Sequence, residues 1–218
     1  MNYFAHALAF LDDPYFVAGT GVPDWLTVVD RGVRLRRTDA EALAGDEDRI
    51  VRAVAGGVVQ HLRDDARFHE SRAFAELSLE LTVRSRDALG GESGFRPSFL
   101  GHLLVEVLLD ATLIQGAPTR LEAYYAALRQ VEPARVEAAV NRVASRPTDR
   151  LAWMIDAFCR HGILWDYLED GKLLPRLNQV MRRVGLDDLP PSFGRLLAGA
   201  RPLVASRADE LLAGIPAR

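Results

Sequence analysis

Cysteine is almost absent from this sequence of 218 residues, since Cys159 is the only one. A single sulfur cannot form an intramolecular disulfide, and it cannot supply the several thiolates of a cysteine-based zinc site. Any metal ion that the protein binds must therefore have nitrogen and oxygen ligands.

The sequence also lacks an excess of basic charge, a long apolar run and a basic leader. Its formal net charge is −3 at pH 7, which is not the charge pattern of a nucleic-acid-binding protein. No run reaches the roughly 18 apolar residues of a membrane-spanning helix, and the first residues lack the positive region of a signal peptide. We expect no nucleic-acid partner, no membrane span and a cytoplasmic location.

Strand signals and several well-known catalytic motifs are missing too. β-Branched residues rarely alternate with polar ones, and residues 27–37, the most strand-like stretch, are interpreted as a loop. There is no Gly-x-Ser-x-Gly, no Walker-type loop and no dinucleotide-binding glycine pattern. These absences argue against serine hydrolases of the common α/β type and against nucleotide-binding α/β folds.

Helical periodicity dominates the sequence. Apolar residues recur at helical spacing over residues 47–69 and 71–89, and Pro97 suits the first position of a helix that runs to about residue 115. Thr119 and Glu122 fit a capping box that opens a further helix to residue 131.

These elements predict an all-α fold. With 49% hydrophobic residues the chain has enough apolar surface for a large core. We expect one domain over residues 1–218, a bundle of about seven to ten helices. Its halves are a metal-site half, about 1–116, and a C-terminal helical half, about 117–218.

The clearest chemistry lies in the helix predicted after Pro97. His102, Glu106 and Asp110 are four residues apart, so they share one face of a helix that is otherwise apolar almost all round. Buried carboxylates without partners are costly, so this stripe needs a metal ion, an arginine or a hydrogen-bond network. The alternative is that the stripe faces solvent or forms salt bridges with a neighbouring helix.

A second stripe has the same spacing. His61, Asp65 and His69 also stand one helical turn apart, and histidine with carboxylate is a common ligand set for transition metals. Taken alone, these residues fit an ordinary exposed stripe equally well. The preceding Gly56-Gly57 pair would let this helix approach another backbone closely.

Two further histidines stand apart from these stripes. His6 lies in an apolar stretch, where a histidine is more often a core or capping residue than a ligand, and Asp24 after Pro23 also fits a helix N-cap. His161 precedes Gly162 and is interpreted as the last residue of a helix before its glycine cap.

The N-terminal segment carries a family resemblance. Residues 1–6 read Met-Asn-Tyr-Phe-Ala-His, and Gly19 is followed by Asp24-Trp25. This resembles the acyl carrier protein phosphodiesterases, which begin Met-Asn-(aromatic or Leu)-Leu-Ala-His and continue with Gly-Asn-x-x-x-Asp-Phe.

Two later segments extend the resemblance over about the first half of the chain. Residues 55–69 resemble the family's Gly-Ile-x-x-His-Arg-x-Ile-Asp-x-x-Thr-Asp segment, with His61 and Asp65 at its histidine and first aspartate. Residues 96–110 resemble its third, acidic helix. The chain departs from the family in having no His-Asp dipeptide and in having His69 at the last aspartate.

The resemblance implies a divergent relative of the HD metal-dependent phosphohydrolases. Such a protein is all-helical and uses one or two divalent ions to activate water for attack on a phosphodiester. The implied substrate is a phosphate ester, and a phosphopantetheine-carrying protein is a candidate partner. Zinc, manganese and iron suit nitrogen and oxygen ligands, and magnesium fits less well.

The hypothesis assigns a role to each candidate residue. Asp65 and Glu106 are the catalytic carboxylates, Asp64 orients a histidine, and Arg63 or Arg67 clamps phosphate. The metal ligands on this hypothesis are His6, Asp24, His61, Asp65, His69, His102, Glu106 and Asp110.

A second resemblance and a different class of function remain as alternatives. The order His61-x-x-x-Asp65, His69 and His102-x-x-x-Glu106 is similar to that of zinc-dependent phospholipase C and the related S1/P1-type nucleases. The chain could instead be a non-catalytic helical protein that binds metal or a partner. Hydrolysis of a phosphodiester and metal content distinguish these hypotheses.

Overall fold

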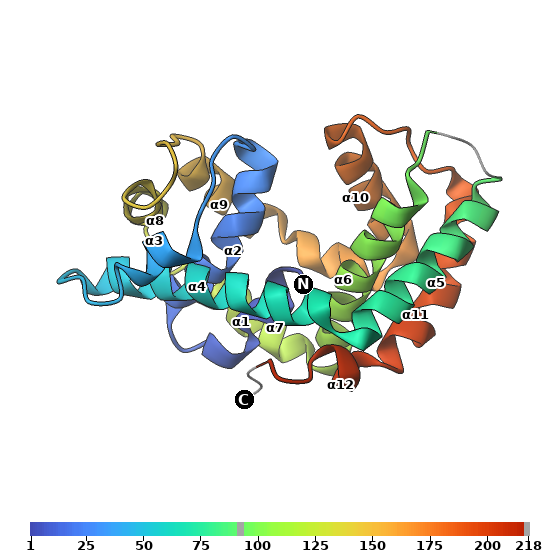
Figure 1. Ribbon diagram of the computed structural model, residues 1–218, viewed down its shortest axis with the longest axis horizontal. Helices are drawn as coiled ribbons and strands as arrows, with labels where there is room; N and C mark the ends of the chain where they lie inside the picture. Colours follow the sequence, from blue (N-terminus) through green and yellow to red (C-terminus); the bar gives the residue numbers. More distant parts are fainter. Residues whose placement is uncertain (91–93, 216–218) are drawn as a thin grey trace. The chain divides into compact units, whose positions relative to one another are not determined.

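Helices form nearly all the regular structure of the computed structural model, which describes residues 1–90 and 94–215 (Figure 1). Within these ranges there is no β-strand, only an isolated bridge between Leu35 and Ala144. The predicted all-α fold class is therefore confirmed. The predicted seven to ten helices correspond to the longer helices of the structure. The additional helices α1, α3 and α12 are short, with five residues or fewer. The HD-like or phospholipase C-like subtype stays a prediction.

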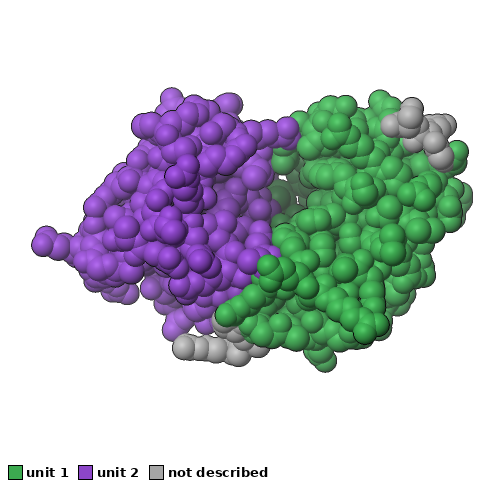
Figure 2. Space-filling model, in the orientation of Figure 1, with its two compact units in different colours: residues 1–2, 67–116, 163–215 green, residues 3–66, 117–162, 216–218 purple. Residues whose placement is uncertain are grey.

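The described residues form two compact units, coloured separately in Figure 2. Unit 1 consists of residues 1–2, 67–116 and 163–215, and unit 2 of residues 3–66 and 117–162. The boundary predicted after residue 116 is a point where the chain passes from unit 1 to unit 2, but each unit draws on both halves of the chain. The single domain over 1–218 stays a prediction, and residues 91–93 and 216–218 lie outside the described ranges.

Unit 2 is organised around α2, which packs against α1, α7, α8 and α9. Trp25 of α2 is fully buried, and Phe158 of α9 meets its ring edge-on at 5.3 Å. Asp13 caps α2 by accepting a hydrogen bond from the Phe16 N–H. The elements of this unit are α1 (Tyr3–Ala7), η1 (Leu8–Phe10), α2 (Pro14–Val29), α3 (Arg37–Glu41), most of α4 (Arg49–Glu70), α7 (Pro118–Leu128), α8 (Pro133–Asn141) and α9 (Leu151–His161).

Glycines bring the backbones of α2 and α4 into direct contact. A Cβ added to Gly57 would lie 2.2 Å from the Phe16 carbonyl oxygen, and one added to Gly19 would lie 2.3 Å from the Val54 carbonyl oxygen. Any larger residue at either position would force the helices apart. The close approach expected from the Gly56-Gly57 pair is therefore present.

Unit 1 is built on α6, which packs against α5, α11 and η2 (Figure 1). Leu104 and Leu108 of α6 and Leu77 and Leu81 of α5 are buried in its core. Gly101 allows α6 to lie against α5, because a Cβ there would be 2.4 Å from the Ser78 carbonyl oxygen. The elements are the end of α4, α5 (Arg72–Ala88), α6 (Pro97–Gly116), η2 (Ile163–Leu168), α10 (Asp170–Arg183), η3 (Pro191–Phe193), α11 (Gly194–Ala205) and α12 (Ala208–Leu211).

Helix α6 is also the described helix that is long and apolar enough, by length and composition alone, to cross a membrane. A helix in the core of a domain meets the same criterion, and 56% of the apolar window is buried within the protein. The expected absence of a membrane span stays a prediction.

Most predicted helix boundaries agree with the structure to within two residues. Ser71 is the N-cap of α5 and accepts a hydrogen bond from the Phe74 N–H, and Pro97 is the first residue of α6. The capping box predicted at Thr119 is wrong. Ala117 is the N-cap of α7 without a side-chain hydrogen bond, because Pro118 already supplies the fixed φ that begins a helix.

We predict that Gly57→Ala lowers the free energy of unfolding by at least about 2 kcal/mol, because its Cβ has no room between α2 and α4. Urea unfolding followed by circular dichroism measures the change. The matched control is Gly171→Ala in α10, where a Cβ meets nothing within 4 Å. It should leave stability unchanged or raise it slightly. Equal effects of the two substitutions would contradict the contact.

Candidate metal centres

Two buried histidines of unit 2 lie against one carboxylate. His6 comes from α1, while His61 and Asp65 stand one turn apart on α4. His6 Nε2 lies 3.3 Å from Asp65 Oδ1, and His61 Nε2 lies 3.3 Å from Asp65 Oδ2. The two imidazole rings stack with their centroids 4.0 Å apart. We call these three residues the unit 2 group.

The opposite edge of each imidazole in this group faces a hydrogen-bond acceptor. His61 Nδ1 lies 2.8 Å from the backbone carbonyl oxygen of Thr20 on α2, and His6 Nδ1 lies 3.5 Å from Asp64 Oδ2. Asp64 is buried and also accepts a hydrogen bond of 2.7 Å from the Gln60 side chain. Since a carbonyl and a carboxylate only accept, these contacts favour the tautomers with hydrogen on Nδ1.

This proton placement determines what the Nε2 atoms present to Asp65. In neutral imidazoles with hydrogen on Nδ1, each Nε2 has a lone pair, and both lone pairs face a carboxylate. His6 Nε2 is buried and has no hydrogen-bond partner among the described residues. Protonating both rings would instead place two like charges in a buried stack, which is costly. A cation between the two Nε2 atoms and the carboxylate satisfies all three.

The ionisation of Asp65 agrees with a ligand role. Burial alone would raise the pKa of its carboxyl, but hydrogen bonds that His6 and then His61 donate when their Nε2 atoms carry hydrogen lower that pKa well below its ordinary value, and a bound cation in place of those hydrogens would lower it in the same way. Asp65 is therefore an anion near neutral pH, as a metal-binding carboxylate must be.

Unit 1 contains a second group of the same composition. His69 comes from the last turn of α4, and His102 and Glu106 stand one turn apart on α6. His69 Nε2 and His102 Nε2 lie 3.0 Å and 3.1 Å from the same oxygen, Glu106 Oε1. The amino group of Met1 lies 3.3 Å from that oxygen too. We call His69, His102 and Glu106 the unit 1 group.

Both histidines and the amino group act on the ionisation of Glu106. Burial alone would raise the pKa of its carboxyl, but hydrogen bonds from His102 and then His69 lower the pKa to about 2. The ordinary value is 4.5. Glu106 therefore stays anionic over the whole range in which the protein is expected to work.

The structure brings six of the eight predicted ligands into two groups of three, one in each unit, and the binding of one or two divalent ions by these residues stays a prediction. Asp24 on α2 and Asp110, buried on α6, belong to neither group among the described residues. His161 is the last residue of α9 before Gly162, whose φ is 56°, as the sequence suggested.

The predictions for residues that do not bind the ion themselves have mixed outcomes. Asp64 does contact a histidine, His6. The two arginines expected to clamp phosphate are engaged elsewhere: Arg63 pairs with Glu41 at 2.7 Å, and Arg67 donates to the Gly214 carbonyl oxygen. The Thr20 carbonyl was not predicted, because a backbone acceptor on another helix leaves no signal in the sequence.

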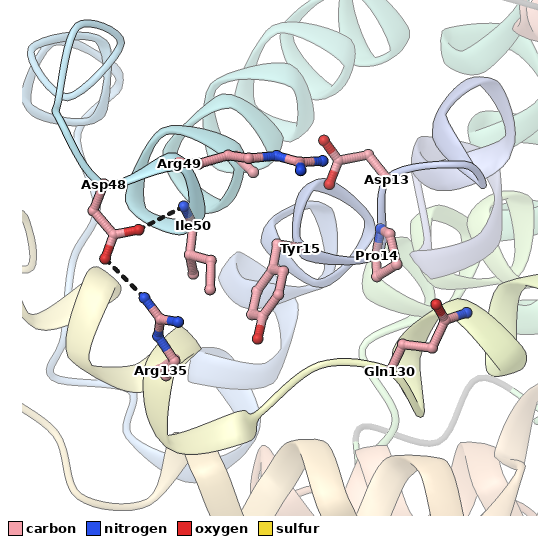
Figure 3. Close-up of a pocket in the computed structure, with 9 residues that line it drawn as sticks. Asp13, Pro14, Tyr15, Asp48, Arg49, Ile50, Gln130 and Arg135 are labelled. Atoms are coloured by element: carbon pink, nitrogen blue, oxygen red, sulfur yellow. Dashed lines mark hydrogen bonds and ion pairs between the residues drawn. The ribbon is translucent and has the colours of Figure 1, made fainter.

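A separate pocket of about 490 Å³ lies in unit 2, at the start of α4 (Figure 3). Asp48 there accepts hydrogen bonds from the Ile50 N–H and from Arg135, and the Arg49 side chain extends toward Asp13. None of the predicted site residues lines this pocket. Asp48 and Arg135 form an ion pair there, and none of the residues that line the pocket belongs to the unit 2 group.

No protein-family model matches this chain, and comparisons with curated proteins and with solved structures find no match. The resemblance to the acyl carrier protein phosphodiesterases, and the weaker one to phospholipase C, therefore stay predictions. Any function assigned to the protein must be supported by the geometry of the two groups.

We predict that Glu106 makes the metal-free protein sensitive to acid. A carboxyl with a lowered folded-state pKa contributes stability above its unfolded pKa of 4.5 and loses it as the pH falls toward about 2. Between about pH 6 and about pH 3, the wild type should lose about 2 kcal/mol more stability than Glu106→Gln. Urea unfolding in chelator measures this, and Glu80→Gln on the exposed face of α5 is the control. Parallel pH curves for wild type and Glu106→Gln would contradict the prediction.

Proposed function

We propose that the protein is a metal-dependent phosphoric ester hydrolase, a phosphodiesterase, whose catalytic ion is held by His6, His61 and Asp65. The observation that supports this most directly is the proton placement in the unit 2 group. When both neutral imidazoles carry hydrogen on Nδ1, their Nε2 lone pairs face the Asp65 carboxylate, and a cation among the three groups would satisfy all of them.

The spacing of the ligand atoms fits such an ion. Bonds of about 2.0–2.1 Å place neighbouring ligand atoms roughly 2.9 to 3.3 Å apart, depending on whether the coordination is octahedral or tetrahedral. His6 Nε2 lies 3.3 Å from Asp65 Oδ1 and His61 Nε2 lies 3.3 Å from Asp65 Oδ2, and the three residues offer ligand atoms within 4.8 Å of one another. Three protein ligands leave further positions for water and substrate, as in catalytic rather than structural zinc sites.

Solvent reaches the group from the carboxylate side. The imidazoles of His6 and His61 are buried, whereas 29% of the Asp65 side chain is exposed. Substrate would therefore approach over Asp65, and the buried imidazoles would hold the ion from behind. Asp64 and the Thr20 carbonyl fix the ring orientations, which is the usual function of groups behind metal-binding histidines.

The bound ion and the residues of the chain would have different roles in the reaction. A bound divalent ion would supply Lewis acidity, making water a better nucleophile and neutralising charge on the phosphoryl group. Asp65 would hold the ion and, through the exposed part of its side chain, accept a hydrogen bond that orients the attacking water, whose proton would pass to solvent. Zinc, manganese and iron suit the two nitrogens and one carboxylate better than magnesium does.

The substrate class rests on the sequence resemblance. A phosphodiester is the substrate that the family resemblance implies, and a phosphopantetheine-carrying protein is the candidate partner. Since Arg63 and Arg67 are paired elsewhere, the ion itself would be the main positive charge opposite the phosphate. A protein that binds metal without turnover is the rival, and activity measurements separate the two.

We predict that the wild type hydrolyses bis-p-nitrophenyl phosphate with added zinc or manganese. His61→Ala and Asp65→Asn should lower kcat/KM at least about 100-fold, because each removes a ligand of the ion. His161→Ala is the matched control, since this histidine lies outside both groups, and it should keep wild-type activity. Bound metal with no turnover of this or other phosphodiesters in the wild type would refute the hydrolase and favour a binding role.

We predict that Asp64→Asn weakens metal binding by about 10- to 100-fold without removing a ligand. The amide can no longer act as an anionic acceptor that keeps the proton of His6 on Nδ1. Competition with a chromophoric chelator measures the dissociation constant. Asp39→Asn, an exposed aspartate on α3, is the control and should bind like the wild type. Unchanged affinity in Asp64→Asn would show that His6 needs no such orientation.

A further inference from the structure

We propose that His69, His102 and Glu106 form a second metal site, complete within unit 1, that takes zinc or a comparable transition ion in an exchangeable way. This inference does not depend on the hydrolase function, because it concerns different residues in a different unit. Two imidazoles and one carboxylate favour borderline transition ions over magnesium and calcium, which prefer oxygen ligands.

The three ligand atoms lie within 4.8 Å of one another, and both nitrogens lie at ligand spacing from the carboxylate oxygen. His69 Nε2 and His102 Nε2 are 3.0 Å and 3.1 Å from Glu106 Oε1. Ligands on bonds of about 2.0–2.1 Å are roughly 2.9 to 3.3 Å apart. The two nitrogen–oxygen distances therefore already match those of a bound ion.

Aromatic packing holds the imidazoles in this orientation. The ring of Phe74 meets both His69 and His102 edge to face, with centroids 4.8 Å and 4.9 Å away. Phe68 contacts His69 in the same way at 5.4 Å. Because packing already restricts the rings, less side-chain entropy is lost when an ion binds.

The unit 1 group differs from the unit 2 group in its metal-free state. Each Nε2 can donate its hydrogen to Glu106, so no buried lone pair is left facing a carboxylate. Neither Nδ1 has a hydrogen-bond partner in the described part of the chain, and the side chains are 32% and 45% exposed. Moving the proton from Nε2 to Nδ1 therefore costs little, since water solvates Nδ1.

This difference leads us to expect that the unit 2 group binds its ion more tightly than the unit 1 group does. The unit 2 group has acceptors behind both imidazoles and an arrangement that is unfavourable without a cation. The unit 1 group has no such acceptors, and an ion there must displace existing hydrogen bonds and oppose the Met1 amino group, 3.3 Å from Glu106 Oε1. We expect the unit 1 ion to bind at least about 10-fold more weakly and to leave first when a chelator is added.

The test uses tag-free protein titrated with cobalt(II), whose visible absorbance reports coordination, and with zinc measured by elemental analysis after gel filtration. The wild type should bind two equivalents of metal. His102→Ala should bind one equivalent tightly, and His61→Ala should bind one equivalent weakly. The double variant should bind none. His161→Ala should take two. Circular dichroism checks folding, and Glu106→Gln, which keeps the side-chain volume, replaces His102→Ala if that variant unfolds.

Each other result overturns part of this assignment. One equivalent in the wild type that His61→Ala removes and His102→Ala keeps refutes the unit 1 site and leaves the proposed function intact. One equivalent that only His102→Ala removes supports the unit 1 site and refutes the proposed catalytic ion. Two equivalents in His102→Ala, no metal in the wild type, or loss of both ions in either single variant contradicts an independent unit 1 site.

Discussion

Helices α2 and α4 meet backbone to backbone at Gly19 and Gly57, and the geometry of the unit 2 group depends on that contact. The contact brings the Thr20 carbonyl within 2.8 Å of His61 Nδ1. That hydrogen bond fixes the proton on Nδ1 and leaves the Nε2 lone pair facing Asp65. A packing constraint between two backbones thus favours one tautomer of His61, and the proposed metal site rests on that tautomer.

The two groups share a composition but differ in how their charges are balanced. In unit 2, buried acceptors lie on the Nδ1 side of both rings, so a neutral ring with hydrogen on Nδ1 presents an Nε2 lone pair to Asp65. In unit 1, the Nδ1 atoms are open to water and the Nε2 atoms can donate to Glu106. Burial and hydrogen-bond partners therefore differ between the two groups, and on this difference we base the proposal of a tightly held ion in unit 2 and an exchangeable one in unit 1.

Much of the site could be predicted from helical spacing. Residues four apart share a helix face, so the pairs His61–Asp65 and His102–Glu106 followed directly from the sequence once their segments were interpreted as helices. His6 lacked any such local partner, and its assignment came only from the family resemblance. Asp24 and Asp110 satisfied the same reasoning as the true group members, yet they lie outside both groups, since a shared face or motif does not specify what packs opposite.

The sequence by itself determined the all-α fold class, most helix boundaries and the pairs of ligands within single helices. These depend on local interactions over one or two helical turns, which the pattern of apolar, capping and breaking residues records. Only the tertiary structure decided that His69 joins His102 and Glu106, and that His6 joins His61 and Asp65. Those pairings depend on which helix faces pack together and how closely glycines such as Gly57 and Gly101 let them approach, and such contacts join residues far apart in the chain.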